Sequence, residues 1–524
     1  MREKVSSVFW STLVISLIMV IWGAISPDTL ASMSSSAQSF ISNKLGWYYL
    51  ILVTLLVIFC IFIIFTPYGK IKLGKPDEKP EFTRLSWFAM LFSAGMGIGL
   101  VFWGTAEPMS HYAVNAPTAE TGSPAAIKEA LQYSYFHWGV HAWAIYAIVA
   151  LVLAYFKFRH DRPGLISATL YPIFGERVNG LLGKVIDVLA VFATIVGVAT
   201  TLGFGAVQIN GGLSYLTDIP NSFSSQLIII GVVTVLFMIS AWTGIGKGIK
   251  YLSNANLGLA GILFLAVFIL GPTIYILNMF TDTIGAYITN FMAMSFRIAP
   301  LNPENREWIN NWTIFYWAWW ISWSPFVGIF IARVSRGRTI REFLVGVLLV
   351  PSIVGFLWFS TFGISAINIQ QQGIADIASL ATEESLFGTL QNYPLGTVLS
   401  IVAITLIGTF FITSADSATF VLGMQTTYGS LNPGSHVKLT WGVIQSSMAA
   451  VLLYTGGLQA LQNVLILAAL PFSVIMILMT VSFYKALKKE KYLVAKDPKP
   501  RKEKRKEKKA GTDNKVDNPA PATK

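Results

Sequence analysis

The stretch FYWAWWISWSPF, residues 315–326, is unusually rich in tryptophan. With the two indoles just before it, this region holds six of the chain's sixteen tryptophans: Trp308, Trp312, Trp317, Trp319, Trp320 and Trp323. With its apolar flanks the stretch is long enough to form a helix that crosses a membrane. In such a helix Tyr316, Trp319 or Trp320, and Trp323 have i, i+3/i+4, i+7 spacing and therefore share one face.

The composition places this helix in a polytopic membrane protein. Of 524 residues, 54% are hydrophobic and only 12% are charged, and the mean hydropathy is +0.60. Soluble domains carry roughly 25% charged residues. We therefore expect an all-α fold with twelve transmembrane helices, and we expect the first to be retained because it lacks a small-residue cleavage site. Their predicted centres are near residues 17, 56, 95, 146, 200, 235, 267, 322, 353, 407, 447 and 472.

The order of these segments predicts an internal repeat. Two leading helices precede a set of five, and a polar, partly amphipathic connector leads to five more. A repeated unit of five spans must reverse its orientation, as in the inverted repeats of many secondary transporters. The connector is expected to be a surface helix, with an ordinary loop as the alternative. The expected division is 1–83, 84–280, 281–310 for the connector, 311–484, and 485–524 for a basic tail.

The distribution of lysine and arginine predicts the orientation. Loops that would lie on the same side as the N-terminus are rich in these residues, as in KFRHDR and ARVSRGRTIRE. The positive-inside rule then places both termini in the cytoplasm of a protein of the cell membrane. Residues 485–524 supply +9 of the net charge of +12. This tail is expected to contact anionic lipids, although it could instead be a solvated segment that only sets topology.

The first span of the first set of five contains SAGMGIGLVFWG, residues 93–104. Glycine costs a helix roughly 1 kcal/mol per residue relative to alanine, so the alternating Gly95, Gly97 and Gly99 favour local unwinding. Unwound backbone can meet a ligand or an ion, whereas close helix packing is the alternative role for these glycines. Because the tryptophan stretch occupies the corresponding span of the second set, we expect a site between the two.

A second aromatic group lies in FHWGVHAWAIY, residues 136–146, with Trp138, Trp143 and Tyr146. Two such faces could form an aromatic box for a quaternary ammonium ion, each contact contributing about 0.5–2 kcal/mol. Neither aromatic span contains an acidic residue. This favours a ligand that brings its own negative charge, a zwitterion.

The segment GTFFITSADSATF, residues 408–420, places Thr413, Ser414 and Ser417 beside Asp416 in an apolar span. An ionisable residue inside a membrane predicts function, and hydroxyl groups with free carbonyls suit sodium. Bonding of these hydroxyls to their own helix is the alternative.

Two further residues within the apolar spans are expected to have structural roles only. We expect Asp187 to pair with Lys184 and Cys60 to be a buried hydrophobe. The chain contains no nucleotide-binding or catalytic motif and no zincin spacing among its five histidines. An ion gradient rather than ATP is therefore the expected energy source, and neither an enzyme nor a nucleic-acid-binding protein is expected.

The motifs AGMGIGLVFWGTAEP, FHWGVHAWAIY, NWTIFYWAWWISWSPF and FFITSADSATF together resemble those of the betaine/carnitine/choline transporter family. The resemblance implies two leading helices plus two inverted five-helix repeats, and a homotrimer. The substrate-binding residues that it implies are Trp138, Trp143, Tyr146, Trp319, Trp320, Trp323, Phe102, Gly97 and Gly99. The sodium site that it implies consists of Ser93, Met96, Phe410, Thr413 and Ser414. A second sodium site would use Thr194, but its partner threonine is replaced by Val198.

Comparison within this family indicates the substrate. Proton-coupled choline carriers have an aspartate where this chain has Gly99, and sodium-independent carnitine exchangers have an arginine in the fifth span, which residues 188–207 lack. The resemblance therefore implies sodium-coupled symport of glycine betaine for osmotic protection, with a tail similar to that of osmotically activated members. A choline, carnitine or proline-betaine carrier remains an alternative. An osmosensor or channel-like protein is an alternative of another class.

Overall fold

The computed structural model describes residues 5–95, 97–243 and 246–496. These residues are almost entirely helical, and ten helices are long and apolar enough to cross a membrane. Nine of the ten correspond to the long helices α1 (Ser7–Ile25), α2 (Pro27–Phe65), α8 (Leu181–Leu216), α9 (Phe223–Thr243), α10 (Gly246–Leu270), α14 (Phe315–Val334), α15 (Ile340–Gln371), α17 (Gly396–Thr426) and α18 (Ser435–Lys496). The shorter ones are α3 (Arg84–Gly95), α4 (Ile98–Met109), α5 (Pro124–Trp138), α6 (Val140–Ala154), α7 (Tyr171–Phe174), α11 (Thr273–Thr289), α12 (Phe291–Ser295), α13 (Pro303–Ile309) and α16 (Ser385–Leu390). The tenth long apolar helix, Pro124–Arg159, combines the shorter helices α5 and α6.

The helix expected to unwind at its glycines is indeed broken. Helix α3 ends at Gly95, and α4 starts at Ile98 after Gly97, whose φ and ψ are −144° and −146°. The two pieces have 12 residues each, so neither is among the ten long apolar helices. Gly139 separates α5 from α6 in the same manner, with φ −93° and ψ −140°. The glycine prediction is therefore confirmed for α3 and α4.

Helix α18 is also interrupted. Its 62 residues contain non-helical backbone at Gly456 and Gly457, and Gly457 has a φ of +61°. A positive φ of this size costs little for glycine but is strained for most other residues. The backbone therefore divides α18 into two helical parts on either side of this glycine pair.

The connector differs from the prediction. Gly271 and Pro272 end α10 at Leu270, and α11 begins at Thr273, before the expected boundary at 280. Helix α11 packs against α5 and α15. The short helices α12 and α13 follow it, so this region contains several helices in place of the single surface helix expected.

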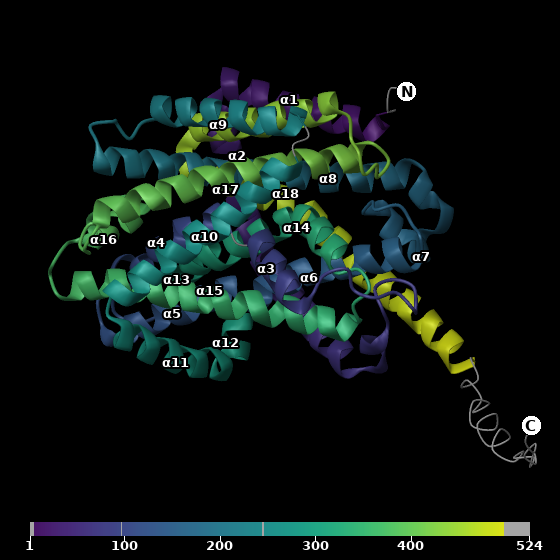
Figure 1. Ribbon diagram of the computed structural model, residues 1–524, viewed down its shortest axis with the longest axis horizontal. Helices are drawn as coiled ribbons and strands as arrows, with labels where there is room; N and C mark the ends of the chain where they lie inside the picture. The colour runs from purple at the N-terminus through teal and green to yellow at the C-terminus, as the bar shows by residue number, and fades with distance from the viewer. Residues whose placement is uncertain (1–4, 96, 244–245, 497–524) are drawn as a thin grey trace, which may run out of the picture.

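The centre of the bundle is formed by α14, which contacts α6, α8 and α18. By contrast, α1, α9 and α10 carry exposed apolar side chains, for example Trp10 at 57%, Ile228 at 68% and Ile262 at 56% exposure. Figure 1 shows α1 and α9 along one edge of the molecule. Apolar side chains at this exposure are expected where helices face lipid.

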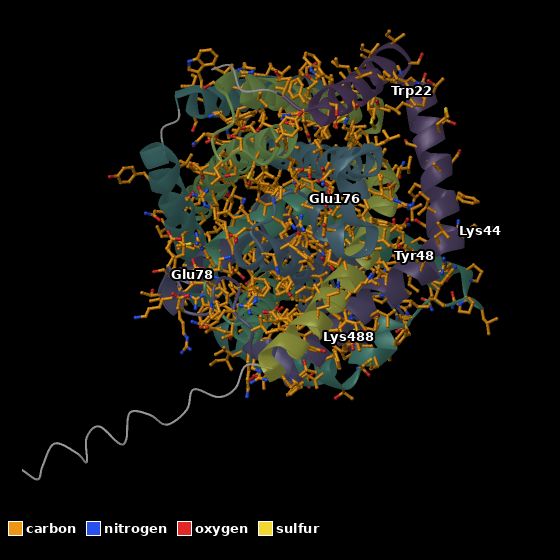
Figure 2. The ribbon with its side chains drawn as sticks, turned by 90° about the vertical axis from the view of Figure 1, so that its right-hand side faces the viewer. Trp22, Lys44, Tyr48, Glu78, Glu176 and Lys488 are labelled. Atoms are coloured by element: carbon orange, nitrogen blue, oxygen red, sulfur yellow. The ribbon has the colours of Figure 1, made fainter. Side chains whose placement is uncertain are left out.

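The two ends of the bundle are distinct. In Figure 1, α16 lies at the left end, and α7 lies at the right end, toward which α18 also finishes. Figure 2 views the molecule from that right-hand side, where Glu78, Glu176 and Lys488 are labelled. We call this the α7 end.

One predicted ion pair is wrong. Asp187 of α8 accepts hydrogen bonds from the backbone N–H of Ser167 at 2.9 Å and from its hydroxyl at 2.7 Å, not from Lys184. The role is structural, as expected, but the partner is 20 residues away. Cys60 is fully buried, as predicted.

Candidate functional site

The aromatic residues predicted to form a box come together between α5, α6 and α14. Trp138 lies 4.8 Å from Trp320 and 6.0 Å from Trp319, measured between ring centroids. Trp319 and Trp320 are stacked at 4.8 Å with an interplanar angle of 12°. Three indoles from two separate helices thus form the core of one cluster.

Tyr146 extends this cluster along α14. Its ring centroid is 5.9 Å from that of Trp320 and 6.4 Å from that of Trp323, and Trp143 follows at 5.6 Å from Tyr146. We call the six residues the aromatic cage: Trp138, Trp143, Tyr146, Trp319, Trp320 and Trp323. Their side chains are only 1–5% exposed.

Trp317 faces away from the cage, as the helical spacing indicates. It stacks on His141 at 5.5 Å and contacts Phe136 at 5.1 Å. Trp317 therefore belongs to the surrounding core and provides a natural control for the cage residues.

Gly99 is required by close packing against the cage. A Cβ atom at this position would lie 2.6 Å from Cη2 of Trp319 and 3.2 Å from Cη2 of Trp138. Phe102, one turn further along α4, stacks on Phe204 at 5.2 Å, and Phe204 in turn meets Trp319 at 5.1 Å. Phe102 is thus linked to the cage through a phenylalanine that the sequence did not single out.

A buried carboxylate lies directly beside the cage. Glu107 of α4 has no exposed surface, and its Oε2 accepts hydrogen bonds from Trp138 Nε1 at 2.8 Å and from the Tyr316 hydroxyl at 2.5 Å. Its Oε1 lies 2.7 Å from Nδ1 of His137. A buried carboxylate needs such partners because an unpaired charge in an apolar interior is costly.

The sequence analysis missed Glu107, although the residue stands in the quoted motif GTAEP. The argument for a zwitterion rested on aromatic spans that lack acids, and the third span supplies one beside them. With two donors on Oε2 and His137 at Oε1, this carboxylate orients Trp138 and Tyr316. The lack of acidic residues in the two aromatic spans therefore no longer supports the inference that the ligand carries its own negative charge.

The indole N–H groups of the cage have different partners. Trp320 Nε1 donates to the backbone carbonyl of His137 at 2.9 Å, and Trp319 Nε1 donates to the Thr201 hydroxyl at 3.3 Å. Trp323 Nε1 and the Tyr146 hydroxyl are buried without a hydrogen-bond partner in the described structure. Those two polar atoms are available to a bound ligand.

The residues of the expected sodium site meet only in part. Ser93 lies in α3, Met96 lies outside the described residues, and a Cβ on Gly97 would be 4.0 Å from the Ser414 hydroxyl. The helix break thus faces α17 as expected. Thr413 donates to the carbonyls of Thr409 at 3.0 Å and Phe410 at 3.2 Å.

Asn256 of α10 is a further residue at this position that the sequence analysis missed. Its Nδ2 donates to the Thr413 hydroxyl at 3.0 Å, and its Oδ1 is buried without a partner. No local pattern marks Asn256, because Thr413 is 157 residues away. At the expected second sodium site, the Thr194 hydroxyl bonds its own helix at the carbonyl of Ala190, 2.8 Å away.

A cavity of about 940 Å³ lies beyond the cage, toward the α7 end. It begins at Phe326, whose ring centroid is 5.7 Å from that of Trp323. Its lining contains Asp416, which accepts a hydrogen bond from Ser240 at 3.0 Å, and Ser417. The basic residues of the lining are Lys157, Arg333, Arg336 and Lys438.

Comparison with known proteins agrees with this arrangement. A model of the BCCT, betaine/carnitine/choline family transporter, matches residues 7–492. The glycine betaine transporter OpuD of Bacillus subtilis is 66% identical over 95% of this chain and 97% of its own length. An ectoine/hydroxyectoine transporter of Virgibacillus pantothenticus is 46% identical over 92% and 96%, respectively.

A probable glycine betaine transporter of Desulfitobacterium hafniense is 42% identical over 93% of this chain and 98% of its own length. The matched region includes the broken α3 and α4, the aromatic cage and α17. The chain therefore belongs to the betaine/carnitine/choline transporter family.

Proposed function

We propose that this protein is a sodium-coupled symporter that accumulates glycine betaine for osmotic protection. The observation that carries the substrate is the 66% identity to the glycine betaine transporter OpuD along nearly the whole of both chains. The aromatic cage supports it because a trimethylammonium group donates no hydrogen bond but is attracted to indole faces. The unpartnered Trp323 Nε1 and Tyr146 hydroxyl could donate to the ligand's carboxylate.

The proposed architecture has twelve spans, arranged as two leading helices and two inverted repeats of five. The broken pair α3 and α4 serves as one span, and the Gly456–Gly457 break divides α18 into two. With the nine other candidate spans, one of which combines α5 and α6, this gives the twelve of the proposal. The basic loops at the α7 end support cytoplasmic termini in the cell membrane. A homotrimer and contact of the tail with anionic lipids complete the proposal.

Transport would proceed by alternating access. Sodium would bind between the Gly97 break and α17, using the hydroxyls of Thr413 and Ser414, and would hold the break in a geometry that completes the cage. The cavity that begins at Phe326 would serve as the path between the cage and the cytoplasm. Rocking of one repeat against the other would then expose the cage to each side in turn.

The test is uptake of labelled glycine betaine into proteoliposomes, with and without an inward sodium gradient. We expect uptake only with sodium, and competition by unlabelled betaine but not by excess choline or carnitine. Ectoine should be included as a competitor because one relative carries that name. Uptake without sodium, or block by carnitine, would overturn the coupling or the substrate assignment.

The sodium site is tested separately with Ser414→Ala. We expect the sodium concentration for half-maximal uptake to rise several-fold because one oxygen ligand is lost. Thr405→Ala is the matched control, since Thr405 lies on the same helix, is exposed and bonds only its own turn at Ile401. Equal sodium dependence in the two variants would contradict the proposed site.

A further inference from the structure

A group of potential metal ligands lies behind the aromatic cage. Glu107, His111 and His137 each offer one ligand atom, and the three atoms lie within 4.8 Å of one another. Glu107 Oε1 is 2.7 Å from His137 Nδ1 and 3.4 Å from His111 Nε2. All three side chains have no exposed surface.

His111 is the unusual member of this group. Its Nε2 lies 3.4 Å from Glu107 Oε1, an ion-pair distance without hydrogen-bond geometry, and its Nδ1 is buried without a hydrogen-bond partner in the described structure. Its ring packs against Trp312 at 4.5 Å and Trp308 at 5.0 Å. A buried polar atom without a partner is costly, and the long contact to Glu107 is the one polar contact of the His111 ring in the described structure.

The surroundings of the group match those of metal ligands. His137 Nε2 lies 3.0 Å from the Thr313 hydroxyl, a contact that can hold the ring with Nδ1 free to bind a metal. Trp138 and Tyr316 occupy Oε2 of Glu107 and leave Oε1 directed at the two imidazoles. Such outer hydrogen bonds are typical of metal sites in proteins because they fix the orientation of each ligand.

We propose that Glu107, His111 and His137 form a binding site for a divalent transition metal of the zinc class. Two imidazoles and one carboxylate suit zinc, nickel, cobalt or copper and leave a fourth position open. With bonds of about 2.0–2.1 Å, the ligand atoms must lie no more than about 4.2 Å apart, so small side-chain movements suffice.

The position of the site suggests its effect on transport. Its ligands come from α4, from the π-helical turn η2 (Ser110–Val114) that continues it, and from α5. A bound metal would tie α4 to α5 beside the cage and restrain the movement of Trp138. Trp312 is partly exposed and Asn311 is exposed next to it, so the ion can approach from this face.

The test uses full-length protein with any affinity tag removed, treated with a chelator and desalted. Zinc binding is measured by titration calorimetry, and cobalt binding by visible absorption, in the wild type, His111→Phe and His436→Ala. His436 is exposed, remote from the cluster and controls for adventitious binding to imidazole. Size-exclusion elution and thermal unfolding report whether each variant is folded.

We expect one zinc ion per chain in the wild type and in His436→Ala, and affinity at least about tenfold lower in His111→Phe. Cobalt bound to the wild type should give the intense visible absorption of a four-coordinate site. This measurement does not depend on comparison with a variant. Absence of that absorption, or equal zinc affinity in His111→Phe and the wild type, would overturn the proposal. Loss of binding in His436→Ala would show binding at the surface only and would also overturn it.

Discussion

The aromatic cage and the cavity beginning at Phe326 lie next to each other on α14 and differ in almost every physical property. Cage side chains are 1–5% exposed and contact one another through their rings, and one of them, Trp138, is anchored to the buried Glu107. The cavity has a volume of about 940 Å³, and its charged lining residues are four basic side chains with Glu81 and Asp416. Trp323 and Phe326, one turn apart on α14, mark the change from one region to the other.

In this structure the cage is closed to solvent, whereas the cavity leaves space between the helices that line it. Hydrogen bonds to a buried carboxylate are strong because the surrounding dielectric is low. At the cavity the side chains of Arg333 and Arg336 are exposed, and ion pairs of exposed side chains contribute little to stability. One half of α14 thus borders a buried hydrogen-bonded network, and the other half borders the cavity.

The largest effect is expected from removing the anchor of the closed region. Glu107→Ala leaves the donors of Trp138 and Tyr316 buried without an acceptor, which should destabilise the protein by about 3 kcal/mol or more. Thermal unfolding of the purified protein measures this, with uptake expected to fall in parallel. Glu120→Ala, an exposed acid before α5, is the control. Equal melting temperatures for the two variants would contradict the anchoring role.

A smaller effect is expected from overfilling the cage. The Cβ of Gly99→Ala would lie 2.6 Å from Trp319 and must displace that indole, at a cost of about 1–3 kcal/mol. Betaine affinity, measured by tryptophan fluorescence, should therefore fall. Gly258→Ala is the matched control because no heavy atom lies within 4 Å of its added methyl group. Unchanged affinity in folded Gly99→Ala would mean that the Trp319 position does not affect binding.

Removing one cage indole separates binding from packing. Trp323→Ala should weaken betaine binding by about 0.5–2 kcal/mol, the contribution of one cation–π contact. Trp317→Ala removes an indole of equal size that stacks on His141 outside the cage. It should lower thermal stability but leave affinity nearly unchanged. If both variants lose the same affinity, the cage residues have no special role in binding.

The smallest effect on basal transport is expected from removing the basic tail. Deleting residues from about 495 onward removes most of the basic tail but no residue of the cage or the cavity. Uptake at low osmolality should match that of the full chain, whereas its activation by added solute should change. An identical osmolality profile in proteoliposomes would exclude a regulatory role for the tail.

Much of the site could be predicted from local sequence. The spacing of Tyr316, Trp319, Trp320 and Trp323 sets a common helix face, because 3.6 residues per turn is a local property. The alternating glycines around Gly97 predicted the break between α3 and α4, because backbone entropy is also local. The length of the apolar segments determined the helical class, and the tryptophan density indicated the aromatic face that is proposed to bind the cation.

The partners of isolated polar residues could be seen only in the tertiary structure. Glu107 meets Tyr316 across 209 residues, and Asn256 meets Thr413 across 157. No periodicity encodes such pairs, because each depends on how separate helices pack and on the need to satisfy every buried polar group. By itself the sequence determined the helices, their break and the aromatic face. Only the folded chain decided that a carboxylate anchors that face and that the cavity opens on its other side.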